Sequence, residues 1–593
     1  MIDVRGLVTN WVRMLMPFLG WIGEVRKPEV LRADITAGVT VALVLIPQSM
    51  AYAQLAGLPV YYGLYASFLP PIIAAFFGSS RQLATGPVAV VSLMTAAALE
   101  PLAAGNAESF VAYAVLLATM VGIFQLALGL LRLGVLVDFL SHPVVLGFTN
   151  AGALIIATSQ LGKLFGVSVE KAEHHYETVW NTILAALESS HVATLGMAAL
   201  AFAIMILLKR YAPRIPGVLT AVVVTTLVSY FTAFKEAGGK VVGTIPEGLP
   251  GLALPEFDMV AVSSLVTTAI TISLIGFMEA ISIAKAMAAR TRQRLDANQE
   301  LVGQGLGNVF SGLFSGYPVS GSFSRSAVNI NAGALTGFSS VVTGLVVGVS
   351  LIWLTPLLYH LPQATLAAVI IMAVINLIKV KPIIHAWKAQ PHDGVVAIVT
   401  FVLTLVVAPH LDQGILAGVI LSLILVLYRS MRPRVAVLSR FKDGTMRDIT
   451  VHNLETCENI ALIRFDGSLY FANAGYFESR ILELVAANPK LKYLIVDGEA
   501  INQIDATGEE ILHHLNDRLK AVNIELLIAR MKKQFVDTLI RTGLYESIGP
   551  ERFFARITNA LDYAWSGLEP DHEATCPLRT GQKTPVLSGK DAV

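Results

Sequence analysis

The chain has 593 residues, of which 54% are hydrophobic and only 14% are charged, and its formal net charge is +1. Soluble domains carry nearer ~25% charged residues, so this composition excludes a soluble globular protein and indicates an integral membrane protein in contact with a lipid bilayer. The near-zero net charge gives no indication of a nucleic-acid partner. The sequence contains no metal-ligand spacing, nucleophile triad or phosphate-binding loop, so we expect no metal, no cofactor and no enzymatic activity.

Residues 1–34 contain scattered charges and the segment WVRMLMPFLGWIGEV, in which tryptophans stand among apolar residues. Such a segment is typical of a helix that lies in the membrane interface, although an ordinary lead-in segment fits equally well. The charges argue against a cleavable signal sequence. We therefore expect a cytoplasmic or interfacial N-terminal region before the first span.

A transmembrane transport domain is predicted from residue 35 to residue 430. A bilayer core requires ~20 residues of apolar helix, and the charge-free stretch from Ile35 to Ser80 holds two such runs. Further apolar runs bring the expected number of spans to about 14: 85–99, 109–131, 139–161, 192–208, 215–234, 260–287, 298–315, 322–336, 338–358, 364–378, 393–409 and 413–428.

Lysine and arginine gather in alternate connections between these runs, which predicts the cytoplasmic side of the protein. Examples are Arg26 and Lys27 before the first span and the later pair Lys209 and Arg210, whereas Glu100 lies in an opposite connection. An even number of spans returns the chain to the side on which it began. We therefore expect a multi-pass protein of the cell inner (plasma) membrane with both termini in the cytoplasm.

Two stretches rich in Gly, Pro, Ser and Thr interrupt the apolar pattern, at 79–94 and at 315–329, and each precedes a helix start. Gly86 and Gly321 in these stretches lie about 235 positions apart, and the first spans of the two halves show a similar offset, which indicates two inverted repeats. Irregular backbone at membrane depth is tolerated only inside protein or along a cavity. Because helix N-termini carry partial positive charge, the paired half-helices predict an anion-binding site.

Arg325 lies within the second interrupted stretch, just inside its half-helix, and precedes a long run without charged residues. A cation in a membrane, at the N-terminus of a helix, is costly unless an anion lies beside it. Ser322, Ser324 and Ser326 add hydroxyl donors nearby. We therefore predict that Arg325 binds a small inorganic anion, with a structural ion pair as the alternative.

Glu279 stands alone in the middle of a predicted span, and intramembrane carboxylates are frequently protonatable. It is the candidate proton-coupling residue, with a fixed pair to Arg325 or a hydrogen bond to backbone as the alternatives. Gln48 and Tyr52 lie one helical turn apart on the first span. They would offer neutral donors to a substrate, or else connect neighbouring helices.

The composition changes after residue 430. Residues 449–565 alternate strand-like segments such as IALIRFDGSLYF with helix-like segments such as FESRILELVAAN, which predicts a soluble cytoplasmic α/β domain. Residues 431–448 are expected to form a linker, and residues 566–593 a disordered tail.

The stretch 47–94, PQSMAYAQLAGLPVYYGLYASFLPPIIAAFFGSSRQLATGPVAVVSLM, resembles the signature region of the sulfate permease (SulP-type) anion transporters. GFMEAISIAKA and GSFSRSAVNINAGALTG resemble later motifs of that family, and LIRFDGSLYFANA and VDGEAINQIDATG resemble its C-terminal STAS domain. The resemblance implies a polytopic α-helical membrane protein with two inverted seven-span repeats, a core domain and a gate domain, followed by a soluble α/β STAS domain. It also implies a homodimer.

Carried over by position, the resemblance implies a substrate site formed by Gln48, Tyr52, Pro87, Val88, Ala89, Ser322, Phe323, Ser324 and Arg325, with Glu279 as the coupling residue. Some bicarbonate-carrying members use sodium and have a hydroxyl side chain four residues after this carboxylate. Ile283 stands at that position here, which favours protons over sodium.

In the STAS part, Thr507 matches a phosphorylatable hydroxyl of related stand-alone proteins, and a phosphate there would suit the start of a helix. The favoured interpretation is simpler: Asp505 and Thr507 cap the helix that follows.

We therefore expect a secondary active transporter of an inorganic anion, with proton-coupled sulfate transport by alternating access as the favoured function. Bicarbonate or dicarboxylate transport, coupled to sodium or protons, is the alternative within the family. A passive anion channel and a membrane-tethered signalling protein are the alternatives of other classes. Glu279 near the predicted site argues against the channel, and the interrupted spans argue against a simple anchor.

Overall fold

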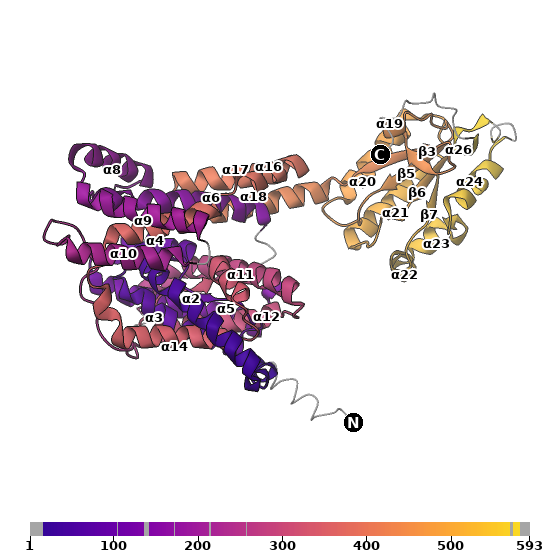
Figure 1. The fold of residues 1–593 in the computed structure, drawn as a ribbon. Helices are drawn as coiled ribbons and strands as arrows, with labels where there is room; N and C mark the ends of the chain where they lie inside the picture. The colour runs from indigo at the N-terminus through magenta and orange to yellow at the C-terminus, as the bar shows by residue number, and fades with distance from the viewer. Residues whose placement is uncertain are drawn as a thin grey trace. The chain divides into compact units, whose positions relative to one another are not determined.

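The computed structural model describes residues 16–569, apart from 104, 136–140, 171, 213–214 and 256–257, together with 573 and 575–580. The chain divides into two compact units, Met1–Ser422 and Leu423–Val593, which are treated one by one (Figure 1). Residues 11–15 of the predicted interfacial segment lie outside the described residues. Its described part forms two short 3-10 helices, Pro17–Gly20 and Glu24–Arg26, and the Trp21 ring between them stacks on Phe76.

A helix occupies each of the predicted apolar runs of the first unit. Among the described residues, seven helical stretches are long and apolar enough to cross a membrane, and five shorter apolar helices accompany them. This confirms a polytopic helical membrane protein, while the number of 14 spans stays a prediction. The helices are α2 Pro28–Leu55, α3 Tyr61–Phe77, α4 Ala89–Ala103, α5 Ala107–Leu130, α6 His142–Ser159, α7 Leu161–Phe165, α8 His175–Ser189, α9 Val192–Tyr211, α10 Gly217–Phe231, α11 Met259–Thr291, α12 Ala297–Leu313, α13 Phe323–Asn331, α14 Phe338–Trp353, α15 Gln363–Val374, α16 Val380–Ala389, α17 Pro391–Val406 and α18 Leu411–Met431.

These helices pack in two groups. In the first group, α12 packs against α3 and α5, and α14 packs against α2 and α3. In the second group, α17 packs against α6, and both α10 and α15 pack against α9. The groups meet where α2 contacts α10 and α15. This division agrees with the expected core and gate domains.

The first helix of the core group, α2, begins several residues before the predicted span, because Pro28 suits the first turn of a helix. Asp34 is fully buried, and its carboxylate accepts hydrogen bonds from the backbone N–H groups of Leu335 and Thr336. One turn later, a Cβ at Gly38 would lie 2.4 Å from the carbonyl oxygen of Ser339, so only glycine permits this approach to α14. Together these contacts fix α2 against the start of α14.

The second unit is a six-stranded sheet with strand order β4-β3-β5-β6-β7-β8, with helices on both faces (Figure 1). β5 to β8 are parallel, and β3 runs antiparallel to both β4 and β5. The predicted soluble α/β fold is confirmed. Its elements are β3 Val435–Arg440, β4 Met446–Asp448, α19 Ile449–His452, β5 Ile460–Phe465, α20 Ala474–Ala487, β6 Tyr493–Asp497, α21 Ala506–Ala521, β7 Glu525–Ala529, α22 Lys533–Thr542, α23 Leu544–Ile548, β8 Phe553–Phe554, α24 Ile557–Ser566 and α26 Pro577–Thr580.

Two expected boundaries of this unit need correction. The linker expected at 431–448 contains β3 and β4, which belong to the sheet because the buried Ala436 and Leu438 alternate with half-buried side chains. The tail expected to be disordered contains α26, and both Leu578 of this helix and Cys576 directly before it are buried against the same face of the sheet as α24. The other residues of the tail from 570 onward, except 573 and 575, lie outside the described part.

Candidate anion-binding site

The two interrupted segments meet in a short antiparallel ladder. Thr85 pairs with Gly321 and Gly86 pairs with Ser320, which defines strands β1 (Thr85–Gly86) and β2 (Ser320–Gly321). α4 begins three residues after β1, and α13 begins two residues after β2. Because antiparallel strands leave their ladder at opposite ends, the N-termini of the two half-helices flank it, and their free N–H groups give this region a positive potential.

Arg325 lies in the first turn of α13 and is fully buried. Its guanidinium nitrogens Nε, Nη1 and Nη2 have no hydrogen-bond partner among the described residues. A Cβ at Gly86 would lie 3.4 Å from Nη2, so the guanidinium lies directly against β1. The burial of a cation without a partner raises the free energy of the folded protein by several kcal/mol. An anion bound beside the guanidinium would offset that cost.

Glu279 lies near the middle of α11, partly exposed, and the described residues give it neither a hydrogen bond nor an ion pair with Arg325. β2 lies against the same helix, because the Ser320 hydroxyl donates a 2.6 Å hydrogen bond to the carbonyl of Gly276. Ile283, one turn after Glu279, packs in an apolar cluster with Leu83 and Met287. The alternative of a fixed Glu279–Arg325 pair therefore receives no support.

Tyr52 of α2 is 6% exposed and is an electrostatic neighbour of both Arg325 and Glu279. Gln48, one turn earlier, is equally buried, and its Oε1 has no hydrogen-bond partner among the described residues. Tyr317, which the sequence analysis did not select, is a further electrostatic neighbour of Arg325, and its hydroxyl lies 3.2 Å from that of Ser92. The structure thus brings Tyr52 and Tyr317 close to Arg325, and Tyr52 close to Glu279.

On the α4 side, the predicted residues Pro87, Val88 and Ala89 are all buried. They connect β1 to α4, and the carbonyl of Val88 accepts the first helical hydrogen bond, from the Ser92 N–H at 3.0 Å. Proline has no N–H group, so at this helix start the available donors are those of the residues after Pro87.

On the α13 side, the predicted residues differ in exposure. Ser322 is the buried N-cap of the helix, whereas Ser324 and Phe323 are exposed, the latter with 59% of its surface accessible. The Ser326 hydroxyl accepts a 2.9 Å hydrogen bond from the Ala84 N–H, so this serine connects α13 to the segment before β1. Ser322, Arg325 and Ser326 are therefore buried polar residues at this end of the site, and the Ser326 hydroxyl is already engaged with Ala84.

A polar row along α12 holds both interrupted segments, and the sequence analysis missed it. We call Glu300, Gln304 and Asn308 the α12 ladder, because they follow one another every four residues on one face of the helix. The buried Glu300 carboxylate accepts hydrogen bonds from the Ser79 and Ser80 N–H groups, both at 2.9 Å.

The other two members of the α12 ladder contact the strands. Gln304 Nε2 donates to the Thr85 hydroxyl of β1 at 2.8 Å. Asn308 pairs with the backbone of Val319, donating to its carbonyl at 3.0 Å and accepting from its N–H at 2.7 Å. The four-residue spacing of the three amide and acid side chains was visible in the sequence and could have revealed this helix as the support of the site.

In the second unit, Asp505 is the N-cap of α21, and its carboxylate accepts hydrogen bonds from the N–H groups of Gly508 and Phe471, both at 2.8 Å. This agrees with the capping interpretation for Asp505. Thr507 lies in the first turn, half-buried, and its phosphorylation stays a prediction.

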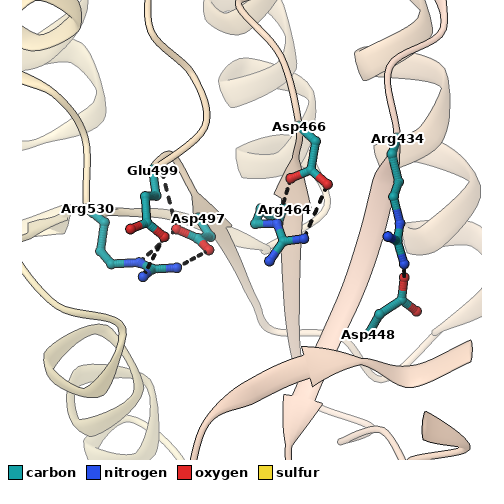
Figure 2. A network of polar contacts seen from close by, with 7 residues as sticks. All are labelled: Arg434, Asp448, Arg464, Asp466, Asp497, Glu499 and Arg530. Atoms are coloured by element: carbon teal, nitrogen blue, oxygen red, sulfur yellow. Dashed lines mark hydrogen bonds and ion pairs between the residues drawn. The ribbon is translucent and has the colours of Figure 1, made fainter. Parts of the chain in front are cut away.

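Charged groups at the carboxyl ends of the parallel strands form a network of ion pairs (Figure 2). Arg530 binds the fully buried Asp497 through two nitrogens and Glu499 through the third, and Arg464 binds Asp466 at 2.6 Å. Each arginine in this network is matched by at least one carboxylate. The network therefore leaves no excess positive charge for an inorganic anion, and the candidate site is the one beside Arg325.

Comparisons with known proteins agree with this geometry. Residues 31–400 match the sulfate permease family, and residues 452–560 match the STAS domain. A chloroplastic sulfate transporter of Arabidopsis thaliana is 37% identical over 94% of this chain and 83% of its own length. A probable sulfate transporter of Mycobacterium tuberculosis is 34% identical over 90% of this chain and 95% of its own.

Two solved structures resemble the fold. The murine Slc26a9 anion transporter, in an inward-facing state, superposes with a TM-score of 0.86 over 94% of this chain and 95% of its own, at 24% identity. The transmembrane domain of the cyanobacterial bicarbonate transporter BicA superposes with a TM-score of 0.57 over 66% of this chain and 97% of its own, at 26% identity.

The helical bundle with two joined half-helices and a STAS domain defines a multi-pass membrane protein of the anion-transporter class. The chain belongs to the sulfate permease family.

Proposed function

We propose that this protein is a secondary active transporter that carries sulfate across the inner (plasma) membrane. The observation that carries the proposal is Arg325, a fully buried cation whose three guanidinium nitrogens lack partners beside the joined half-helices. An oxyanion would accept hydrogen bonds from these nitrogens and from the helix N-termini. Sulfate is the favoured anion because the similar proteins from Arabidopsis and Mycobacterium are named sulfate transporters.

Transport would proceed by alternating access, in which the core group of helices moves against the gate group. Protons are the favoured coupling ion, with Glu279 as their binding site, because Ile283 provides no oxygen ligand for sodium. An ionised Glu279 would oppose the field that attracts the anion, and protonation would remove that opposition. Proton and anion binding should therefore be positively linked, to the same extent in both directions.

The experiment is sulfate uptake into proteoliposomes at fixed external pH, with and without an inward proton gradient. Wild-type protein should concentrate sulfate only with the gradient. Glu279→Gln, which mimics the neutral carboxyl, should still exchange sulfate but should lose gradient-driven accumulation. Accumulation that persists in Glu279→Gln would place the proton elsewhere, uptake that follows sodium would refute proton coupling, and flux that never exceeds equilibrium would indicate a channel.

Bicarbonate is the second candidate substrate, because BicA shares the fold of the membrane unit at 26% identity. Competition against labelled sulfate by bicarbonate and by a dicarboxylate, in the same liposomes, distinguishes these three candidate substrates.

We also propose that the protein is a homodimer. Light scattering, which measures the mass of the purified protein in detergent, would test this.

A further inference from the structure

The chain contains two cysteines, and the second unit brings them together. Cys457 lies shortly before β5, and Cys576 lies directly before α26. They are 5% and 1% exposed, and their side chains are hydrogen-bonded to each other. No disulfide joins them in this structure. The only two thiols of a 593-residue chain, about 119 positions apart in sequence, are therefore in contact.

Their surroundings are apolar. Both cysteines belong to the core that α24 and α26 form on one face of the sheet, together with Leu438, Trp565 and Leu578. The hydrogen bond from Cys576 and, next, burial raise the pKa of the Cys457 thiol, so this thiol is protonated at neutral pH. Small buried cysteines can simply fill space in such a core. Packing alone, however, does not require that the two meet.

The position of Cys576 gives the contact a consequence. α26 has four residues, and the buried side chain of Leu578, with that of Cys576 directly before the helix, attaches it to the sheet beside β3. So short a helix has little stability of its own and depends on these contacts. A covalent bond at Cys576 would therefore fasten the end of the described chain to the sheet.

We propose that Cys457 and Cys576 are a reversible thiol–disulfide pair that fastens the α26 segment to the STAS sheet. A low-molecular-weight disulfide such as oxidised glutathione is the oxidant. When the short α26 segment detaches from the sheet, the Cys576 thiol is exposed and loses its proton, and the thiolate attacks the oxidant and releases one glutathione thiol. When the segment packs again, the Cys457 sulfur attacks the mixed disulfide, loses its proton and releases the second glutathione thiol. Two protein thiols lose two protons and two electrons, and the oxidant is reduced to two thiols. In a reducing cytoplasm the dithiol is the resting form.

Peptide mapping of the full-length protein in detergent tests this. The protein is equilibrated for a day in glutathione buffers from fully reduced to fully oxidised, alkylated, and digested with trypsin without reduction. In oxidised buffer, the peptide 448–464 should be linked to the peptide 557–579, and reduction should reverse the link. Thiols that both remain open to alkylation after unfolding, or a link that joins two chains, overturns the proposal.

A second measurement distinguishes a redox-active cysteine pair from two cysteines that only fill space in the core. Closing a loop of about 119 residues should raise the unfolding temperature of the second unit by roughly 5–15 °C in oxidised relative to reduced buffer. Cys457→Ala and Cys576→Ala should each lose this redox dependence, whatever their own stability. An unfolding temperature that is the same in both buffers for the wild-type protein contradicts the proposal.

Discussion

Arg325 favours the binding of an anion but lowers the stability of the protein when no anion is bound. In other buried positions of this protein a charged group has partners: Asp34 accepts three hydrogen bonds and Asp497 binds Arg530. Arg325 has none among the described residues, so it stores an unfavourable free energy that only a ligand relieves.

We expect Arg325→Met to weaken sulfate binding by ~10–100-fold, because charge-assisted hydrogen bonds contribute about 1.5–3 kcal/mol each. The same variant should unfold at an equal or higher temperature than the wild type without sulfate, because an unpaired buried charge is removed. Thermal unfolding with and without sulfate measures both effects.

The control is Arg81→Met, which removes a half-exposed arginine whose partner is Glu24 at 3.0 Å. It should leave the shift in unfolding temperature caused by sulfate unchanged. A sulfate-induced shift in Arg325→Met as large as in the wild type would show that the anion binds elsewhere.

At the scale of elements, the α12 ladder sets the position of both half-helices. Asn308 offers the clearest test, because its side chain binds both the N–H and the carbonyl of Val319, as a neighbouring strand would. Asn308→Leu would leave a buried N–H and a buried carbonyl without partners, at a cost of ~1–3 kcal/mol each. We expect β2 to shift, so that the KM for sulfate rises at least several-fold while the maximal rate changes less.

The matched control is Asn376→Leu, since Asn376 is exposed and donates only to the carbonyl of Met372 one turn earlier. Uptake kinetics normalised to folded protein would compare the two. An Asn308→Leu protein that folds and keeps its KM would show that the α12 ladder stabilises the bundle without positioning the site.

The elements show which features a sequence can predict. The spans and the paired interruptions could be predicted from composition. A helix that crosses the bilayer must be apolar, and Gly, Pro, Ser and Thr inside such a run mark irregular backbone, which is tolerated only inside protein or along a cavity. The polar spacing along α12 was visible in the sequence, but which backbone groups its side chains bind depends on which helices meet, and no local pattern contains that information. The same holds for the position of Tyr317 beside Arg325. β3 and α26 were missed because short segments at a domain edge have weak periodicity and acquire order only from the core they join.

For the molecule as a whole, the second unit should fold without the first. We expect a fragment of residues 435–580 to unfold cooperatively, and a fragment of 449–565 to unfold at a temperature lower by ~10 °C or more. The shorter fragment lacks Leu438 and Leu578, whose burial contributes ~1.5–3 kcal/mol each, and it leaves the β5 edge unpaired. Thermal unfolding followed by circular dichroism compares the two fragments. Equal unfolding temperatures would show that β3 and α26 are dispensable.

The β1–β2 ladder has a consequence for biosynthesis. Thr85 and Gly86 are synthesised long before Ser320 and Gly321. The backbone groups of β1 therefore have no strand partner while more than half of the membrane unit is still being made. In a bilayer such groups need protection, which water, lipid headgroups or the insertion machinery must supply until β2 arrives. The anion site is therefore completed late, when the second half of the unit closes over the first. Amino-acid changes that slow this closure would lower the yield of inserted protein even where the finished transporter works normally.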